Sequence, residues 1–274
     1  MRARRVKKAV RKNFDQSASA YQEFEQRSGF FTGLAGELAQ WAGVKKGMRV
    51  LDVGCGTGVS TAALARLVGD GGLVVGVDLS EGMLREAHRT LAGERNVELL
   101  HGDAEDLGEV IRSYGVFDAA LFNATIFLLP QPAAAVREAA QVLAPGGVMG
   151  WNNLLGLEDA AGADLYPALE EKAGVPLRRP QLGGVEELER GGGDVPWANA
   201  PLEEAAVRES LFPVDWETAR DFYLIPAQSA GLLPKIPYEE RVALLRPAFD
   251  AVSQGRGEGP AFRWRFVRYR INAS

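Results

Sequence analysis

A short run of alternating glycines is the feature that most constrains what this chain can fold into. Gly54, Gly56 and Gly58 directly follow the apolar stretch 49–53, where a strand would have to turn sharply into a helix. Glycine permits positive φ angles, and it lacks the Cβ atom that would hold the backbone away from a ligand. The run therefore predicts a ligand-binding turn between a strand and a helix.

Two common ligands of such turns are disfavoured here. A dinucleotide fingerprint, G-x-G-x-x-G, would need glycine where the frames from Gly54 and Gly56 place Val59 and Thr61. A phosphate-binding loop would need Gly-Lys-Ser/Thr, which does not follow these glycines. Asp52, just before the run, would repel a pyrophosphate and attract an ammonium group. The turn therefore favours a ligand with a cationic amino acid end.

The surrounding sequence predicts an α/β fold. Apolar runs alternate with helical patterns from about residue 48 to 154, which is typical of a parallel sheet. The expected strands are 49–53, 73–77, 97–101, 117–122 and 148–152, and the expected helices are 60–68, 81–91 and 132–143. The sequence Pro145-Gly146-Gly147 is predicted to form the turn that ends the last of these helices.

The alternation breaks down after residue 154. A stretch rich in glycine and proline runs to about residue 201, and its glycines at 183–184 and 191–193 are candidate hinges. Leu165 and Leu169 suggest a short helix there. Beyond it we expect a strand at 206–214, helices at 216–230 and 238–252, and a terminal strand at 262–271. The apolar residues of that strand change phase after Phe266, which predicts either a bulge or a change of environment.

Two further acidic residues follow the second and third expected strands. Asp78 stands twenty residues after Gly58, where a carboxylate can accept hydrogen bonds from both hydroxyls of a ribose. Asp103 follows the third strand in Gly102-Asp103-Ala104, where it can accept from an adenine amino group. Each aspartate alone could instead cap a helix or stabilise a turn. Together with the glycine turn, they predict a site for an adenosine joined to a cationic amino acid.

These motifs, taken over residues 14 to 154, resemble the class I S-adenosylmethionine-dependent methyltransferases, in particular the ubiquinone and menaquinone biosynthesis C-methyltransferase group. The resemblance implies a Rossmann-like, doubly wound α/β fold with a helical cap and a seven-stranded sheet in the order 3-2-1-4-5-7-6, the last strand antiparallel. It implies that the glycine turn surrounds the methionine moiety, and that Tyr21 closes over the cofactor from an N-terminal helix. The cofactor-binding residues that it implies are Tyr21, Asp52, Gly54, Cys55, Gly56, Gly58, Asp78, Leu79, Met83, Asp103, Ala104 and Asn123.

One domain with four parts is expected from this resemblance. Residues 1–29 would be a helical lid, 30–154 the cofactor-binding core, 155–256 an insertion and cap for the acceptor, and 257–274 the terminal strand of the sheet. Methyl transfer is helped by excluding water, yet both substrates must enter and leave. We therefore expect segments 1–29 and 155–201 to be mobile without ligand; a static surface loop is the alternative for the second segment.

The expected reaction is transfer of a methyl group from S-adenosylmethionine to a small-molecule acceptor at carbon, oxygen or nitrogen. A sulfonium methyl is already activated, so alignment matters more than a strong acid or base, and no catalytic base is predicted. The segment after the fourth strand begins Asn123-Ala124-Thr125, without the Asn/Asp-Pro-Pro-Tyr of enzymes that methylate base amino groups or glutamine. The alternatives are a non-catalytic protein that binds the cofactor or its product, and a nicotinamide-dependent oxidoreductase.

Composition narrows the partners and the location. The net charge of −5 disfavours nucleic acid and anionic membranes as partners. One cysteine and two histidines leave no structural zinc site and no internal disulfide, so we expect a cytoplasmic protein. Seven of the first twelve residues are basic, which predicts a solvated helix, with a nucleic-acid-binding arm as the alternative. No signal peptide or membrane span is expected.

Overall fold

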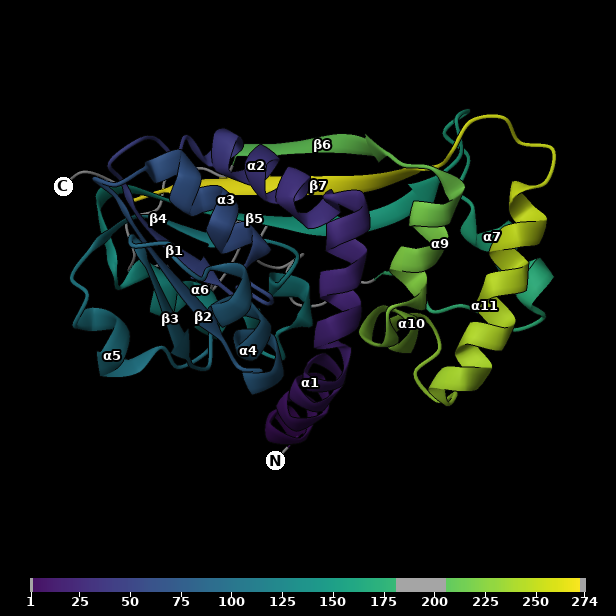
Figure 1. Cartoon of the computed structure of the whole chain (residues 1–274), viewed down its shortest axis with the longest axis horizontal. Coiled ribbons are helices and arrows are strands. Elements are labelled where there is room, and N and C mark those ends of the chain that lie inside the picture. The colour runs from purple at the N-terminus through teal and green to yellow at the C-terminus, as the bar shows by residue number, and fades with distance from the viewer. Residues whose placement is uncertain (1, 181–205, 272–274) are drawn as a thin grey trace, which may run out of the picture.

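Seven strands form a single sheet in the order β3-β2-β1-β4-β5-β7-β6, as the computed structural model shows for residues 2–180 and 206–271 (Figure 1). The strands are β1 (Arg49–Val53), β2 (Leu73–Asp78), β3 (Val97–His101), β4 (Phe117–Phe122), β5 (Leu143–Glu158), β6 (Ala206–Pro213) and β7 (Ala261–Arg270). The neighbours from β3 to β5 pair in parallel, and β7 pairs antiparallel with both β5 and β6. The predicted doubly wound sheet and its strand order are confirmed.

Helices cover both faces of the sheet. They are α1 (Arg2–Ser28), α2 (Phe30–Ala42), α3 (Val59–Val68), α4 (Glu81–Thr90), α5 (Gly108–Arg112), η1 (Ile126–Leu128), α6 (Pro132–Ala140), α7 (Tyr166–Ala173), α9 (Trp216–Leu224), α10 (Pro226–Leu232) and α11 (Tyr238–Ser253). Side chains alternate across each strand, so Val50 packs in one core with Leu34 of α2 and Leu64 of α3, while Leu51 packs in the other core with Val136 of α6. Burial on both faces explains why the inner strands are continuous apolar runs.

The predicted turn at Pro145-Gly146-Gly147 was placed wrongly. Helix α6 ends earlier, at Ala140, and β5 begins at Leu143 and runs through these residues to Glu158. The pairing with β4 shifts between Phe117 and Ala119, so the extra residues loop out without ending the strand. Ile271 after β7 continues the ladder, since its carbonyl accepts from Gly146 N–H and its N–H donates to Gly147 O.

A proline divides the helix that was predicted at 216–230. Helix α9 ends at Leu224, Ile225 is extended with a ψ of 132°, and Pro226 begins α10. A residue before proline avoids the helical region because its backbone would clash with the proline ring. The single predicted helix was therefore wrong, and the corner that replaces it turns α10 toward α1.

The phase change in the terminal strand reflects a change of environment. Phe262 and Phe266 belong to one core cluster, whereas Val267 and Tyr269 belong to the other. Pairing with β5 is continuous across Phe266 and Val267, so the strand has no bulge there. The first half of β7 is covered on one face by aromatic side chains of α2 and α9, and its second half is buried on the opposite face.

The cap extends from the end of the sheet that β5, β6 and β7 reach (Figure 1). Helices α7, α9 and α11 pack together there. The range expected for the cap, 155–256, also contains sheet residues, because β5 continues to Glu158 and β6 pairs with β7. The glycine hinges expected at 183–184 and 191–193 lie outside the described residues.

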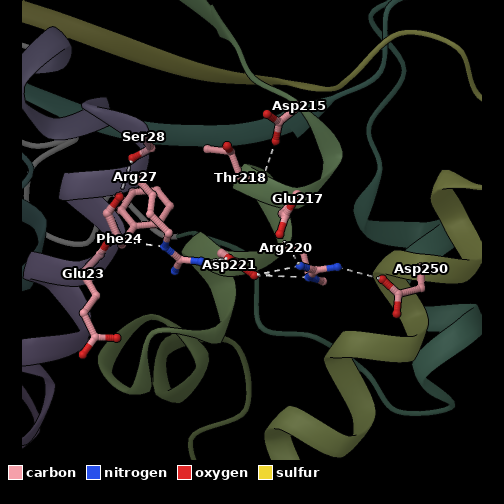
Figure 2. A network of polar contacts seen from close by, with 10 residues as sticks. All are labelled: Glu23, Phe24, Arg27, Ser28, Asp215, Glu217, Thr218, Arg220, Asp221 and Asp250. Atoms are coloured by element: carbon pink, nitrogen blue, oxygen red, sulfur yellow. Dashed lines mark hydrogen bonds and ion pairs between the residues drawn. The ribbon is translucent and has the colours of Figure 1, made fainter.

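Helix α1 lies between the sheet domain and the cap, in contact with α4 on one side and α10 on the other (Figure 1). Asp15 accepts hydrogen bonds from Ser80 Oγ and Gly82 N–H, which docks α1 on the start of α4. Toward its other end, Arg27 contacts Asp221 of α9 at 2.7 Å (Figure 2). Within the described ranges, none of the helices combines the length and apolar character needed to cross a bilayer.

Candidate cofactor site

The glycine turn after β1 is fixed by the neighbouring strand. Gly54 N–H and Cys55 N–H both donate to the carbonyl of Val77 at the end of β2. Gly56 has a φ of 56°, and a Cβ there would meet nothing within 4 Å. Gly58 differs, because a Cβ there would lie 3.0 Å from Ala87 of α4. Gly56 therefore leaves open space for a ligand, whereas Gly58 lets α3 pack against α4.

Asp78 ties the end of β2 to this turn. Its Oδ2 accepts a hydrogen bond of 2.9 Å from Gly56 N–H, and its Oδ1 accepts one of 2.8 Å from Ser80 N–H. Burial raises the pKa of this carboxyl, and the two backbone hydrogen bonds oppose that rise. A carboxylate offers about four lone-pair directions, so two remain available. Asp78 can therefore accept two more hydrogen bonds directly beside the open face of Gly56.

Asp103 is paired with a residue from the far N-terminus. Lys7 of α1 places its Nζ 2.6 Å from Asp103 Oδ2 and 2.6 Å from Glu105 Oε2. Burial lowers the pKa of Lys7, but the hydrogen bonds to these two carboxylates outweigh it and raise the pKa above its ordinary value. The predicted solvated N-terminal helix was thus wrong for Lys7, whose side chain is only 22% exposed.

A buried polar network holds the segment after β4. Asn123 donates from Nδ2 to Ser60 Oγ at 2.8 Å and accepts from Asn152 Nδ2 at 2.7 Å. Asn152 Oδ1 in turn accepts from Ala124 N–H at 2.6 Å. Ala124 has a φ of 51°, a region that residues with a Cβ seldom adopt. The network therefore orders a strained turn in the wall of the cavity described below.

Asp52 lies beneath the turn. It is fully buried, its Oδ2 accepts from Thr61 Oγ1 at 2.7 Å, and among the described residues its Oδ1 has no hydrogen-bond partner. Burial raises the pKa of Asp52 to about 7, opposed by the Thr61 hydrogen bond and reinforced by the charge of Asp78. Burial likewise raises the pKa of the neighbouring Cys55 thiol, so this thiol stays protonated at neutral pH.

These groups surround a cavity of about 1040 Å³, its open mouth included. All the predicted cofactor-binding residues line it except Asp52 and Gly58. The predicted residues that it brings together are Tyr21, Gly54, Cys55, Gly56, Asp78, Leu79, Met83, Asp103, Ala104 and Asn123.

Several lining residues were missed from the sequence. They come from α1, from the start of α2, from the segment around η1 and from α10, and include Lys7, Phe14, Phe31, Thr125, Leu128 and Gln228. Phe14 precedes Tyr21 by two helical turns, so the helical spacing could have indicated that both face the same way. Gln228 lies 207 residues from the tyrosine that it contacts, and no local pattern reveals such a contact.

Comparison with known proteins identifies the central part of the chain. Residues 50–147, which contain the glycine turn, Asp78 and Asp103, match the family described as a methyltransferase domain. These residues are a methyltransferase domain. The prediction of the family is thereby confirmed for this part of the chain.

Two relatives match part of this chain. The chain is 37% identical over 143 residues to aklanonic acid methyltransferase DauC of Streptomyces sp. (strain C5). The aligned residues cover 52% of this chain and 63% of that protein. It is 42% identical over 107 residues to demethylmenaquinone methyltransferase of Staphylococcus aureus (strain MRSA252). Here the aligned residues cover 39% of this chain and 43% of that protein. The chain thus spans less than two thirds of either relative's length.

The fold around the methyltransferase domain recurs in a solved structure. The YcgJ protein from Bacillus subtilis matches with a TM-score of 0.56 and 17% identity, over 88% of this chain and 99% of that one. At this identity the likeness shows the fold alone.

Proposed function

We propose that this chain transfers a methyl group from S-adenosylmethionine to a small-molecule acceptor. The observation that carries the proposal is the hydrogen bond from Gly56 N–H to Asp78 Oδ2, beside two unused acceptor positions of the same carboxylate. This arrangement suits a ribose whose two hydroxyls bind Asp78 while the chain attached to it continues over the open face of Gly56. The methyltransferase domain that contains both residues supports the same assignment.

The other lining residues fit the rest of the cofactor. Leu79 and the buried Met83 offer apolar surface for the adenine ring, and Asp103 with Ala104 offers acceptors and donors at its edge. The turn from Gly54 to Gly56 would hold the methionine end, together with the segment that begins at Asn123. Asp52 lies beneath this turn, and its ionised form would favour a cationic group above it.

The residues act by holding and aligning the substrates. When bound, S-adenosylmethionine would supply a methyl group that is already activated for transfer by the positive charge on its sulfur. Among the described lining residues, the carboxylates Asp78, Asp103 and Glu105 all lie at or just beyond the ends of β2 and β3, and no histidine is present. The chain therefore contributes orientation and exclusion of water more than proton abstraction.

Transfer of a labelled methyl group tests this proposal. The full chain is incubated with S-adenosylmethionine labelled in its methyl group and with a panel of small-molecule extracts, and label is followed into products. We expect labelled product with the wild-type chain and loss of most of it with Asp78→Ala. Binding of the cofactor with no transfer to any acceptor would instead favour a non-catalytic binding protein.

The cytoplasmic location expected from the sequence stays a prediction.

A further inference from the structure

A polar pair in the cavity joins the N-terminal helix to the cap. Gln228 of α10 donates from Nε2 to Tyr21 Oη of α1 at 2.9 Å, and both side chains line the cavity. Among the described residues, neither the Tyr21 hydroxyl hydrogen nor Gln228 Oε1 has a further partner. If the amide is turned over, Tyr21 donates to Gln228 instead and the amide N–H groups become free. In either orientation the pair offers a ligand at least one donor and one acceptor.

The pair lies far from the end of the cavity assigned to adenine. Lys7, which contacts Asp103, and Tyr21 are on the same helix, and their separation of fourteen positions corresponds to about 21 Å at 1.5 Å per residue. An adenine held at Asp103 is therefore distant from the pair. The remaining end of the cavity is the part available to a methyl acceptor.

The surroundings of the pair are apolar and aromatic. Tyr21 stacks on Phe14, with ring centroids 5.7 Å apart, and contacts Phe31 at 5.5 Å. Both phenylalanines line the cavity. Burial raises the pKa of Tyr21, so its hydroxyl remains a donor at neutral pH. Aromatic walls suit a flat apolar ring, and a hydrogen bond in such surroundings discriminates strongly between ligands with and without its partner.

We infer that Tyr21 and Gln228 bind the methyl acceptor, and that the acceptor is a flat, largely apolar molecule bearing a hydroxyl or carbonyl oxygen. The inference rests on the proposed function, since it assigns the acceptor end of the same cavity. It also moves Tyr21, which the family resemblance places over the cofactor, to the acceptor. A second contact between α1 and the cap is the ion pair of Arg27 with Asp221 of α9 at 2.7 Å (Figure 2).

Binding of a matched pair of probes tests this inference. The affinities of 2-naphthol and naphthalene for the full chain are measured by fluorescence, with and without saturating S-adenosylhomocysteine. We expect the wild-type chain to bind 2-naphthol about tenfold more tightly than naphthalene, which corresponds to one buried hydrogen bond. Gln228→Leu and Tyr21→Phe should each remove most of this difference while leaving naphthalene binding unchanged.

A matched control and the cofactor affinity separate the possible outcomes. Tyr238→Phe removes a cap hydroxyl that binds Leu224 O outside the cavity, and it should preserve the naphthol preference. Equal binding of the two probes by the wild-type chain would overturn the inference. So would a fall in S-adenosylhomocysteine affinity in Tyr21→Phe and Gln228→Leu, because it would place the pair at the cofactor. If the wild-type chain fails to bind S-adenosylhomocysteine, the proposed function fails, and the probe comparison without it still shows whether the pair binds a hydroxylated ring.

Discussion

Lys7 and Asp103 lie 96 residues apart in the sequence, yet the Lys7 ammonium is 2.6 Å from Asp103 Oδ2. The same ammonium contacts Glu105, whose side chain is only 2% exposed. One residue of α1 thus pairs with two carboxylates at the end of the cavity assigned to adenine. The position of the N-terminal helix and the charge of the candidate site are coupled through this contact.

Lys7→Met should loosen the first turns of α1. Removing the ammonium leaves the nearly buried Glu105 beside Asp103 without their cation, and we expect a loss of about 1.5 kcal/mol in the free energy of unfolding. Hydrogen exchange should speed up in residues 2–13. Lys8→Met, at an exposed position of the same helix, is the matched control. Equal exchange in the two variants would show that Lys7 does not hold the helix.

Cofactor binding should slow exchange in α1 more than in the sheet, because this helix would close over the bound molecule. The comparison is between the free chain and its complex with S-adenosylhomocysteine. Protection confined to the glycine turn and to Asp78, with α1 unchanged, would contradict a closing role for the helix.

Asp78→Ala should weaken S-adenosylhomocysteine binding by about 1.5 to 3 kcal/mol, the usual cost of losing hydrogen bonds to a charged group. Asp78→Glu should lose less affinity for S-adenosylhomocysteine, because it keeps the negative charge but displaces the carboxylate. Asp70→Ala, in an exposed loop, provides the control. Titration calorimetry on folded variants measures all three. Unchanged affinity in Asp78→Ala would remove Asp78 from the site.

Asp52 should make the protein less stable as pH rises. Its pKa of about 7 in the folded chain exceeds the value of about 3.9 expected when unfolded, so the folded state holds the extra proton and stability falls between about pH 4 and pH 7. Asp52→Asn should therefore be more stable than the wild type at about pH 8, by about 2–4 kcal/mol, with a smaller gain at about pH 5. Denaturant unfolding at both pH values measures this. A constant difference between the two proteins would show that Asp52 does not titrate in this range.

Gly56→Ala and Gly58→Ala should fail in different ways. A Cβ at Gly58 would press on Ala87 of α4, so this variant should lose stability while its folded fraction still binds S-adenosylhomocysteine. A Cβ at Gly56 enters open space, although the φ of 56° strains any residue with a Cβ, so this variant should lose less stability than Gly58→Ala and should lose affinity. Thermal unfolding and calorimetry distinguish the two. A Gly56→Ala chain with full affinity would mean that no ligand approaches this face of the turn.

The sheet and the cofactor end of the site could be predicted from the sequence because their signals are local. The first four strands are apolar runs, and parallel strands bring the residues that follow them to one edge of the sheet. Asp78 and Asp103 therefore reach one cavity with the glycine turn. The sequence could not show which side of the turn each residue faces. Asp52 and Gly58 were therefore predicted to bind the ligand, although neither lines the cavity.

The residues that reach the cavity from helices outside the sheet could not be predicted in the same way. Lys7 and Gln228 reach the cavity from α1 and α10, and their partners are distant in the sequence. A basic residue in a basic segment, or a glutamine at the start of a short helix, usually lies on the protein surface. The sequence therefore does not indicate that either residue lines a cavity. The predicted helix 216–230 is divided at Pro226 into α9 and α10. This division also bears on the site, because Gln228 of α10 contacts Tyr21.

The most direct test of the central claim is the thermal stability of the full chain with S-adenosylmethionine, S-adenosylhomocysteine or NAD. We expect both adenosyl compounds to stabilise the fold, by about 2.7 kcal/mol at a concentration one hundred times the dissociation constant. We expect no stabilisation by NAD. Stabilisation by NAD alone would contradict the claim that this cavity binds S-adenosylmethionine.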